Sequence, residues 1–520
     1  MNILYIIPQK IAESEIYTPI PLIRISNYLN SRKEELDKNI REKLIDLRLE
    51  KLPKFIPEQF DFYKEKLSKL LNSIYTSFSF DIVAISCYGS HSYINSLVVA
   101  NQIKFGISKS IQIIVGGHHP SFCPEDFQPS NIPKSLSIEE NKTPFDFLIY
   151  GEGEKPFFNL IKELSYKEVK NNLSEDVKVI KPSLIRDLNS LPEIDFQLIN
   201  KYKRSYLDGE TMFLDFSRGC PYSCHFCANS SIPKEIKFIR MKSIDNSIRE
   251  LGKCLEEGWK KIQISDPIFL VRRRSREKFF EHLRNFPYNF EYPRQIFIYD
   301  RIDNISNHDL INFQKYNLIP QFGLEAVSPT LLRRINKTSQ PRKYINRFIE
   351  IVKFSNEIGL YPKFNMILNL PGTDRNCLRE TRKYLFNQTD PLIKKYLINF
   401  NFSVYYNIPK TELYKSSRSR FGAEFFEEKW WKIFDSNQKI MSYLVRPSKS
   451  LSLEESLEEY YSIFKQIIRN QRNFDKSIHS NKSFYLVWGK INQIIKLSKK
   501  YEKSGVQRGK QPKLFSQPPI

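Results

Sequence analysis

The sequence lacks any apolar run of the roughly 18 residues that a helix needs to cross a bilayer. Its first eight residues, Met1 to Pro8, contain neither a basic leader nor a small-residue cleavage site. Hydrophobic residues make up 41% of the chain, aromatic residues 14% and charged residues 27%, which excludes a mostly disordered, collagenous or coiled-coil molecule. We therefore expect a folded, soluble, cytoplasmic protein without a membrane span, with room for about three domains.

Acidic residues are too few to balance the basic ones. Lysine and arginine number 81 against 58 aspartates and glutamates, which gives a net charge of +23. Such a charge favours contact with phosphates, acidic peptides or an anionic membrane surface. However, the basic residues are spread over the whole length, and the sequence contains neither a stacking-aromatic motif nor a recognition helix. A nucleic-acid partner is therefore not favoured.

The sequence also lacks the paired cysteines of a disulfide framework. Seven cysteines are an odd number, and no secretion signal accompanies them. Four of them stand alone and are expected to be buried as small apolar residues: Cys87, Cys123, Cys254 and Cys377. The other three lie within eight residues of one another and carry more information.

Two series of strands alternating with helices are expected. In the first 165 residues, short apolar runs typical of a parallel sheet are separated by helix-length stretches. These runs are Asn2–Ile7, Lys43–Leu47, Asp81–Ser86, Ile111–Val115 and Phe145–Tyr150. They predict an α/β fold with a doubly wound, Rossmann-like (flavodoxin-like) sheet, whose ligand crevice lies at the carboxyl ends of the strands.

The second series predicts a partial (β/α)6 barrel over residues 205–415, with chemistry where its strands end. Its strand candidates are Met212–Phe216, Lys261–Ser265, Gln295–Tyr299, Ile319–Leu324, Lys363–Leu370 and Leu397–Tyr406. Between the two series, residues 166–204 lack periodicity and are interpreted as a linker. Residues 416–498 read as helices only, with Ser452 and Glu455 resembling a capping box, and residues 499–520 as a basic, flexible tail.

The three crowded cysteines, Cys220, Cys224 and Cys227, have the spacing Cys-x3-Cys-x2-Cys and follow the first strand of the second series. Thiolates are ligands of iron-sulfur clusters, and three of them can hold three irons of a [4Fe-4S] cube while the fourth iron stays open. Two alternatives compete: a zinc site with His225 as fourth ligand, or three structural cysteines. A chain tight enough to point Cys224 and Cys227 at one metal should turn His225 away.

This loop resembles the defining motif of the radical S-adenosylmethionine (radical SAM) superfamily. The resemblance implies that the open iron binds the amino and carboxylate groups of SAM, with Phe226 near the adenine. It also implies that electron transfer from the cluster releases a 5′-deoxyadenosyl radical. Further strand ends match expected SAM contacts of the family: Ser265, Asp266, Arg301, Glu325 and Ser328. The segment Leu370–Thr373 departs from the family pattern, with Thr373 in place of a glutamate.

Fused before such a barrel, the first half resembles the cobalamin-binding domain of the cobalamin-dependent radical SAM subfamily. The matching segments are Gly116–Phe122 and Asp146–Glu154. The resemblance implies cobalamin contacts at Cys87, Ser90, Gly116, Gly117, His118, Ser121, Gly151 and Glu152. An Asp-x-His-x-x-Gly signature for an axial histidine is absent, which leaves the lower face of the cobalt unassigned and leaves open a domain that binds nothing.

The function that follows is methylation of an unactivated carbon of a small molecule or peptide. Such a carbon has no lone pair to attack SAM, so a radical must first remove hydrogen before methylcobalamin delivers the methyl group. A reducing partner such as flavodoxin or ferredoxin is implied, and no side chain is assigned to catalysis. The alternatives are a radical cyclisation or rearrangement without methyl transfer, a cobalamin sensor with an inert barrel, and a nucleic-acid-binding protein with a structural cluster.

Overall fold

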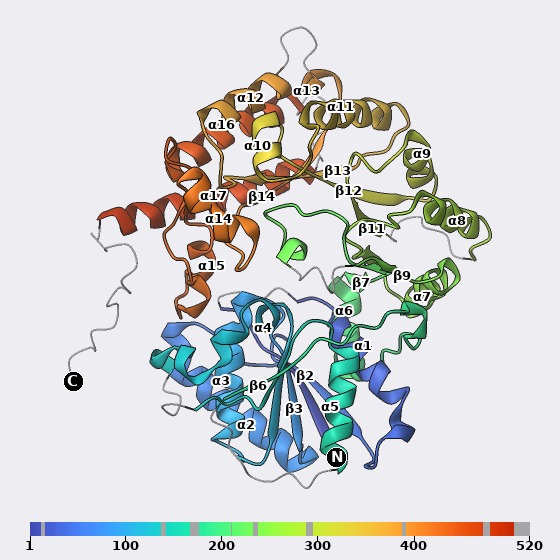
Figure 1. Cartoon of the computed structure of the whole chain (residues 1–520), viewed down its shortest axis with the longest axis vertical. Coiled ribbons are helices and arrows are strands. Elements are labelled where there is room, and N and C mark those ends of the chain that lie inside the picture. The colour runs from blue at the N-terminus through green and yellow to red at the C-terminus, as the bar shows by residue number, and fades with distance from the viewer. Residues whose placement is uncertain are drawn as a thin grey trace.

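The computed structural model describes residues 1–11, 16–136, 142–166, 176–209, 211–231, 238–287, 295–386, 392–471 and 479–503. Two parallel sheets, each of six strands, form its framework. Figure 1 shows the N-terminal sheet in the lower half of the molecule and the second sheet, with the C-terminal helices beside it, in the upper half. Both predicted sheets and the fold class are confirmed.

The N-terminal sheet has the strand order β2-β1-β3-β4-β5-β6 with all pairs parallel. Its strands are β1 (Asn2–Ile7), β2 (Arg41–Asp46), β3 (Ile82–Ser86), β4 (Gln112–Gly116), β5 (Phe147–Ile149) and β6 (Lys178–Ile180). All six residues of β1 are buried, and they alternate between two hydrophobic cores. Helices must therefore cover both faces of this sheet.

Four helices supply that cover. The two that share the core of Tyr5 are α1 (Ile20–Asn30) and α5 (Glu154–Tyr166). The two that share the core of Leu4 are α2 (Phe60–Phe78) and α3 (Tyr93–Lys104). The order of the strands reverses between β1 and β3, because β2 lies on one side of β1 and β3 to β6 lie on the other, and ligands bind at such a switch point in folds of this kind.

Strand β6 falls in the segment interpreted from the sequence as a linker, residues 166–204. It is an edge strand of three residues, pairs in parallel with β5, and has no fully buried residue. A strand so short and so exposed leaves no apolar run to detect. Residues 167–175 of the same segment lie outside the described part of the chain.

The second sheet has the order β14-β13-β12-β11-β10-β7, also entirely parallel. Its strands are β7 (Met212–Leu214), β10 (Lys261–Ile264), β11 (Gln295–Asp300), β12 (Leu318–Glu325), β13 (Lys363–Leu368) and β14 (Asn399–Val404). In Figure 1 the helices between these strands line the outer side of the sheet. They are α7 (Ile244–Glu256), α8 (Arg273–Arg284), α9 (Asn307–Lys315), α10 (Pro329–Arg334), α11 (Pro341–Glu357) and α12 (Arg375–Leu385).

The C-terminal region is mainly helical, with α14 (Glu412–Phe421), α15 (Gln438–Met441), α16 (Leu453–Gln471) and α17 (His479–Lys503). The expectation of helices alone is wrong in one place, because β15 (Glu424–Phe425) pairs antiparallel with β16 (Val445–Arg446). The capping box of Ser452 and Glu455 at the start of α16 is confirmed. Helix α17 continues to Lys503, and residues 504–520 of the predicted tail lie outside the described residues.

The C-terminal region also packs against the N-terminal sheet. Trp430 and Trp431 are buried in the same core as α2 and α3. The Trp431 indole donates a hydrogen bond of 2.7 Å to Asp126. Within the described residues, no helix is long and apolar enough to span a membrane.

Candidate functional site

The three crowded cysteines lie on a loop that starts from a small hairpin. Strand β8 (Ser217–Arg218) pairs antiparallel with β9 (Arg240–Met241), and the cysteines follow β8 directly. Between β8 and Cys220, Gly219 has a φ of 95°, and a Cβ atom there would lie 2.4 Å from the carbonyl oxygen of Phe238. A glycine is therefore required at the entrance of the loop.

The three thiols are neighbours in the structure. Cys224 is buried, whereas Cys220 and Cys227 are half-buried, and the Cys227 amide donates to the Cys224 carbonyl at 3.1 Å. Burial raises the pKa of Cys227 to about 11, and the nearby Cys224 and Cys220 raise it as well. No metal-binding group of three or more His, Cys, Asp or Glu side chains is found among the described residues.

His225 forms contacts with other parts of the protein through both its backbone and its ring, and the sequence predicts that its ring turns away from the cysteines. Its amide donates to Ile335, and its carbonyl accepts from Leu413 at 3.0 Å. Its ring Nδ1 lies 3.2 Å from the Arg334 carbonyl oxygen and 3.2 Å from Arg420 Nη1. The imidazole thus contacts α10 and α14, and the donors left on the loop are three sulfurs.

Two cations surround Cys224. Arg301, which follows β11, places Nη1 3.7 Å from the Cys224 sulfur and donates through Nη2 to the Lys337 carbonyl at 2.8 Å. Its guanidinium also stacks over the ring of Tyr222 at 3.9 Å. Lys337 is buried, and although burial alone would lower its pKa, Tyr344, Glu325 and Cys224 raise it. Positive charge at this position stabilises thiolates and any anionic group that they bind.

Glu325 ends β12 and pairs with Lys337 at 3.1 Å. It has a φ of 65°, and the register between β12 and β13 shifts between Gly323 and Glu325. A Cβ atom on Gly323 would lie 2.5 Å from the Glu325 carboxylate and 2.9 Å from the Lys337 amine, so the glycine leaves room for this pair. Sequence reasoning found Arg301 and Glu325 but missed Lys337, since no motif marks it.

The other three residues predicted as polar SAM contacts form hydrogen bonds to other groups of the protein. Asp266 is buried and accepts hydrogen bonds from the Phe216 amide, the Ser217 amide and the Ser217 hydroxyl. Ser265 donates to the Leu214 carbonyl at 2.9 Å. Ser328 caps α10, where it accepts from the Leu331 amide and donates to Glu380.

Phe226 is half-buried and packs against the larger hydrophobic core. Together with the contacts of Asp266, Ser265 and Ser328, this shows how the loop and the strand ends are fixed in place. The contact of each of these residues with SAM stays a prediction.

The predicted cobalamin contacts gather at the carboxyl edge of the N-terminal sheet. Gly117 has a φ of 125°, and a Cβ atom there would lie 2.3 Å from the Cys87 carbonyl oxygen, so the ends of β3 and β4 approach closely. The Cys87 amide donates to Gly116 at 2.8 Å. Ser121 donates to the Gly117 carbonyl at 2.7 Å and accepts from the Gly151 amide at 2.9 Å. Three loops are therefore joined into one surface.

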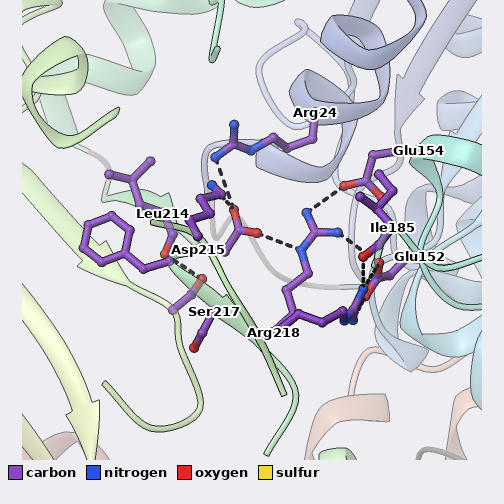
Figure 2. A network of polar contacts seen from close by, with 12 residues as sticks. Arg24, Glu152, Glu154, Ile185, Leu214, Asp215, Ser217 and Arg218 are labelled. Atoms are coloured by element: carbon purple, nitrogen blue, oxygen red, sulfur yellow. Dashed lines mark hydrogen bonds and ion pairs between the residues drawn. The ribbon is translucent and has the colours of Figure 1, made fainter. Parts of the chain in front are cut away.

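The polar side chains on this surface have different surroundings. The imidazole of His118 is exposed and meets Tyr88 edge to face, with ring centroids 5.1 Å apart. Desolvation lowers its pKa, which favours the neutral ring. Ser90 lies 2.9 Å from the buried His119. Glu152, by contrast, turns to the hairpin beside the cysteines and forms ion pairs with Arg218 and Arg240 (Figure 2).

The carboxyl edges of the two sheets face each other. Glu152 follows β5 and meets Arg218, which follows β7, while the ring of His91, beyond β3, lies 6.3 Å from that of Tyr406, beyond β14. Three tyrosines at these edges remain partly exposed, namely Tyr88 (41%), Tyr299 (36%) and Tyr406 (40%).

These tyrosines are close enough to affect one another. Burial raises the pKa of Tyr406, and so do Tyr88 and Cys227; burial and Tyr88 likewise raise that of Tyr299. Tyr406 therefore lies within electrostatic reach of both a cobalamin-loop residue and a cluster-loop cysteine. Sequence reasoning missed all three rings, because each is a single aromatic residue on a different element: Tyr88 follows β3, Tyr299 lies in β11 and Tyr406 follows β14.

Residues 214–385 match the family model of the radical SAM superfamily. The chain contains a radical SAM domain. This domain begins at the end of β7, includes the three cysteines, and ends with α12, and it lies within the range 205–415 that the sequence predicts for the barrel.

The regions matched by two curated relatives are longer than the radical SAM domain. An uncharacterized methyltransferase of Pyrococcus horikoshii is 26% identical over 324 residues, covering 60% of this chain and 65% of the relative. An anaerobic magnesium-protoporphyrin IX monomethyl ester cyclase of Cereibacter sphaeroides is 22% identical over 387 residues, covering 70% of this chain and 57% of the relative. The chain spans less than two thirds of the length of either relative.

One solved structure shares the fold over nearly the entire chain. The radical S-adenosylmethionine methyltransferase TsrM from Kitasatospora setae, solved with cobalamin and a [4Fe-4S] cluster bound, superposes with a TM-score of 0.61. The match covers 97% of this chain and 99% of TsrM at 12% sequence identity. The arrangement of an N-terminal doubly wound sheet, a radical SAM domain and a helical region is thus a known one.

Proposed function

We propose that this protein is a cobalamin-dependent radical SAM enzyme that methylates an unactivated carbon. The observation that carries the proposal is that the predicted cobalamin loops meet the strand ends of the second sheet: Glu152 forms an ion pair with Arg218 at 3.2 Å, and the ring of His91 lies 6.3 Å from that of Tyr406. A radical generated at the cluster and a methyl group carried on a corrinoid must reach the same carbon. The carboxyl edges of the two sheets face each other, so the two cofactors can act on a substrate bound between them.

The donor set on the cluster loop fits a [4Fe-4S] cluster. Cys220, Cys224 and Cys227 offer three neighbouring sulfurs, and His225 is held away from them. A cluster with one open iron, when bound with SAM and reduced, supplies a 5′-deoxyadenosyl radical. Arg301 and Lys337 place positive charge beside Cys224, where an anionic cluster needs it.

The loops of the N-terminal sheet fit a flat macrocycle. Gly116, Gly117 and Gly151 carry no side chain at the sheet edge, and at Gly117 the approach to Cys87 leaves no room for one. Cobalamin bound there supplies a methyl group for transfer to a carbon radical. Ser121 fixes the two glycine loops relative to each other, and the neutral His118 ring and Tyr88 line the edge.

The proposal includes a small-molecule or peptide substrate, a reducing partner such as flavodoxin or ferredoxin, and a cytoplasmic location. The methyltransferase names of the Pyrococcus relative and of TsrM support methyl transfer. The cyclase name of the Cereibacter relative supports a second candidate, a radical cyclisation without methyl transfer. Both candidates share the cluster and SAM.

Anaerobic purification and cluster reconstitution test the proposal. With hydroxocobalamin, SAM and dithionite present, we expect iron, sulfide and bound corrinoid in the protein, and 5′-deoxyadenosine among the products. Methyl transfer adds S-adenosylhomocysteine to these products, whereas the cyclisation candidate yields 5′-deoxyadenosine alone. Protein that contains zinc in place of iron, or that cleaves no SAM, overturns the proposal.

A further inference from the structure

We propose that Glu152 and Glu154 are positioning residues that couple the predicted cobalamin loops to the cluster loop. They do so by holding Arg218 and Arg240, the arginines of the β8–β9 hairpin that carries the cysteines. The coupling rests on the proposed function, since it needs both cofactors. The positioning itself needs only the cluster.

Arg218 binds carboxylates from both halves of the molecule (Figure 2). Its Nη1 lies 3.2 Å from Glu152 and its Nη2 lies 2.7 Å from Glu154, both on the turn after β5. Its Nε lies 2.7 Å from Asp215, at the end of β7. A planar guanidinium that meets three carboxylates has little freedom to move without breaking a charged hydrogen bond.

Arg240 completes the arrangement from the other strand of the hairpin. Its Nη1 lies 3.0 Å from Glu152 and donates to the Ile185 carbonyl at 2.8 Å, and its Nη2 also pairs with Glu152. Glu152 therefore bridges the two arginines across the hairpin. The side chains of Arg218, Arg240 and Glu154 are 16%, 6% and 7% exposed, so water replaces these partners poorly.

Hydrogen bonds connect this ion-pair cluster to the glycine loops. Ser121 bonds to Gly117 on one side and to Gly151 on the other, and Gly151 immediately precedes Glu152. On the opposite side, Gly219 alone separates Arg218 from Cys220, and its close approach to Phe238 keeps the loop entrance tight. A ligand that shifts the glycine loops would thus shift Glu152, then Arg218, then the first cluster cysteine.

A second group of ion pairs joins the same two halves and meets the first at Asp215, which binds both Arg24 and Arg218 (Figure 2). Glu250 on α7 pairs with Arg24 of α1 at 2.7 Å and with Lys242 at 2.7 Å. Its side chain is 9% exposed. Glu250→Gln is therefore the control for Glu152→Gln, because it removes a buried carboxylate of the same network but keeps every carboxylate that Arg218 and Arg240 bind.

The first measurement is the affinity for hydroxocobalamin, followed by absorbance, with and without a reconstituted cluster. Coupling requires that the cluster change this affinity, and typical coupling energies correspond to a change of about fivefold or more. We expect such a ratio in the wild type and in Glu250→Gln. In Glu152→Gln we expect the affinities with and without the cluster to be nearly equal. In Arg218→Lys we expect an intermediate ratio of the two affinities, because lysine keeps the positive charge but lacks the planar guanidinium that bonds several carboxylates at once.

The second measurement needs no cobalamin: the rate at which a chelator removes iron from the reconstituted cluster. We expect faster loss from Glu152→Gln and Glu154→Gln than from wild type, and the wild-type rate from Glu250→Gln. The thermal unfolding temperature of each variant shows whether faster iron loss comes from a shifted loop or from a generally destabilised chain. The positioning role is wrong if the wild type, Glu152→Gln and Glu154→Gln lose iron at the same rate. It is also wrong if Glu152→Gln and Glu250→Gln change the rate of iron loss equally.

The two failures can be told apart. If the wild type binds no hydroxocobalamin, the coupling and the cobalamin part of the proposed function are both wrong, while the iron-release rates still decide the positioning. If it binds hydroxocobalamin with the same cluster dependence in Glu152→Gln, the coupling alone is wrong and the proposed function stands.

Discussion

At the scale of single residues, the structure separates side chains that face the cysteines from those that support them. Arg301 contacts Cys224, and Cys224 helps to raise the pKa of Lys337, whereas Asp266 holds the backbone of the segment that leads to the cysteines. Both Arg301 and Asp266 are predicted as SAM contacts from the family resemblance and from their places at strand ends. The end of a strand predicts where along the sheet edge a residue lies, but not whether its side chain is already hydrogen-bonded to other residues of the protein.

The three cysteines should each be required for iron binding. We expect Cys220→Ala, Cys224→Ala and Cys227→Ala to lose the cluster and all formation of 5′-deoxyadenosine, because the loop offers three sulfurs and His225 is held away. Cys254→Ala is the control, since Cys254 is buried in α7 away from the loop. Iron and sulfide analysis checks the result, and full iron content in any loop variant contradicts it.

Arg301 should tune the cluster potential. Reduction adds an electron beside Cys224, and the guanidinium 3.7 Å from that sulfur favours the reduced state. We expect Arg301→Gln to lower the midpoint potential on the order of tens of millivolts, and Arg301→Lys to lower it less. A redox titration followed by EPR measures both values. An unchanged or raised potential in Arg301→Gln would be inconsistent with this role.

Asp266 should make stability depend on pH. Burial raises its pKa to about 6 despite three hydrogen bonds from Phe216 and Ser217. The unfolded chain has an aspartate pKa of about 3.9, so the folded chain binds the proton more tightly and this group's contribution to stability falls as pH rises between these values. Compared with Asp266→Asn, the wild type should lose roughly 2 to 3 kcal/mol of unfolding free energy from pH 4 to pH 7.

Urea unfolding of the cluster-free protein at both pH values measures this difference. The comparison with Asp266→Asn removes the contribution of all other titrating groups. Parallel stability curves for the two proteins would contradict this prediction, because they would show that the pKa of Asp266 is the same in the folded and the unfolded chain.

At the scale of elements, the β8–β9 hairpin decides where the cysteines lie. The sequence predicts the cysteine loop from its spacing, but strands of two residues have no periodicity to recognise. Strand β6 escaped prediction for the same reason, with three residues at an exposed edge. Long buried strands such as β1 were predicted to the residue because all of their residues are apolar or buried.

Gly219 is the residue on which the hairpin geometry depends most. We expect Gly219→Ala to speed iron loss from the cluster, because the new methyl group would lie 2.4 Å from the Phe238 carbonyl and the residue has a φ of 95°. Backbone strain of this kind costs roughly 1 to 3 kcal/mol. Gly359→Ala is the control, since Gly359 also has a positive φ but nothing within 4 Å. Iron release and thermal unfolding of both variants distinguish a local from a general effect.

At the scale of the whole molecule, the sequence predicts two alternating domains and a helical region, and this arrangement is confirmed. It could not predict how the two sheets meet. Glu152 was expected at a cobalamin, yet its carboxylate lies on Arg218 and Arg240, more than 60 positions further along the chain. Trp430 and Trp431 likewise pack into the N-terminal core, a contact that no local pattern signals.

Contacts between distant segments also create the shared space in which we place the reaction. Tyr88 and Tyr406 come from loops of the two sheets and Tyr299 from strand β11, and their partial exposure and the electrostatic effect of Tyr88 on the other two appear only after folding. The cluster cysteines could be named from spacing because all three fall within eight consecutive positions of one loop. The aromatic residues around them could not.

The EPR spectrum of the reduced, reconstituted protein, recorded with and without SAM, tests the cluster and its open iron together. We expect the signal of a [4Fe-4S] cluster whose g values change when SAM is added, because SAM binds the iron that Cys220, Cys224 and Cys227 leave open. A protein that shows no such signal after reconstitution, or a signal that SAM leaves unchanged, would contradict the assignment.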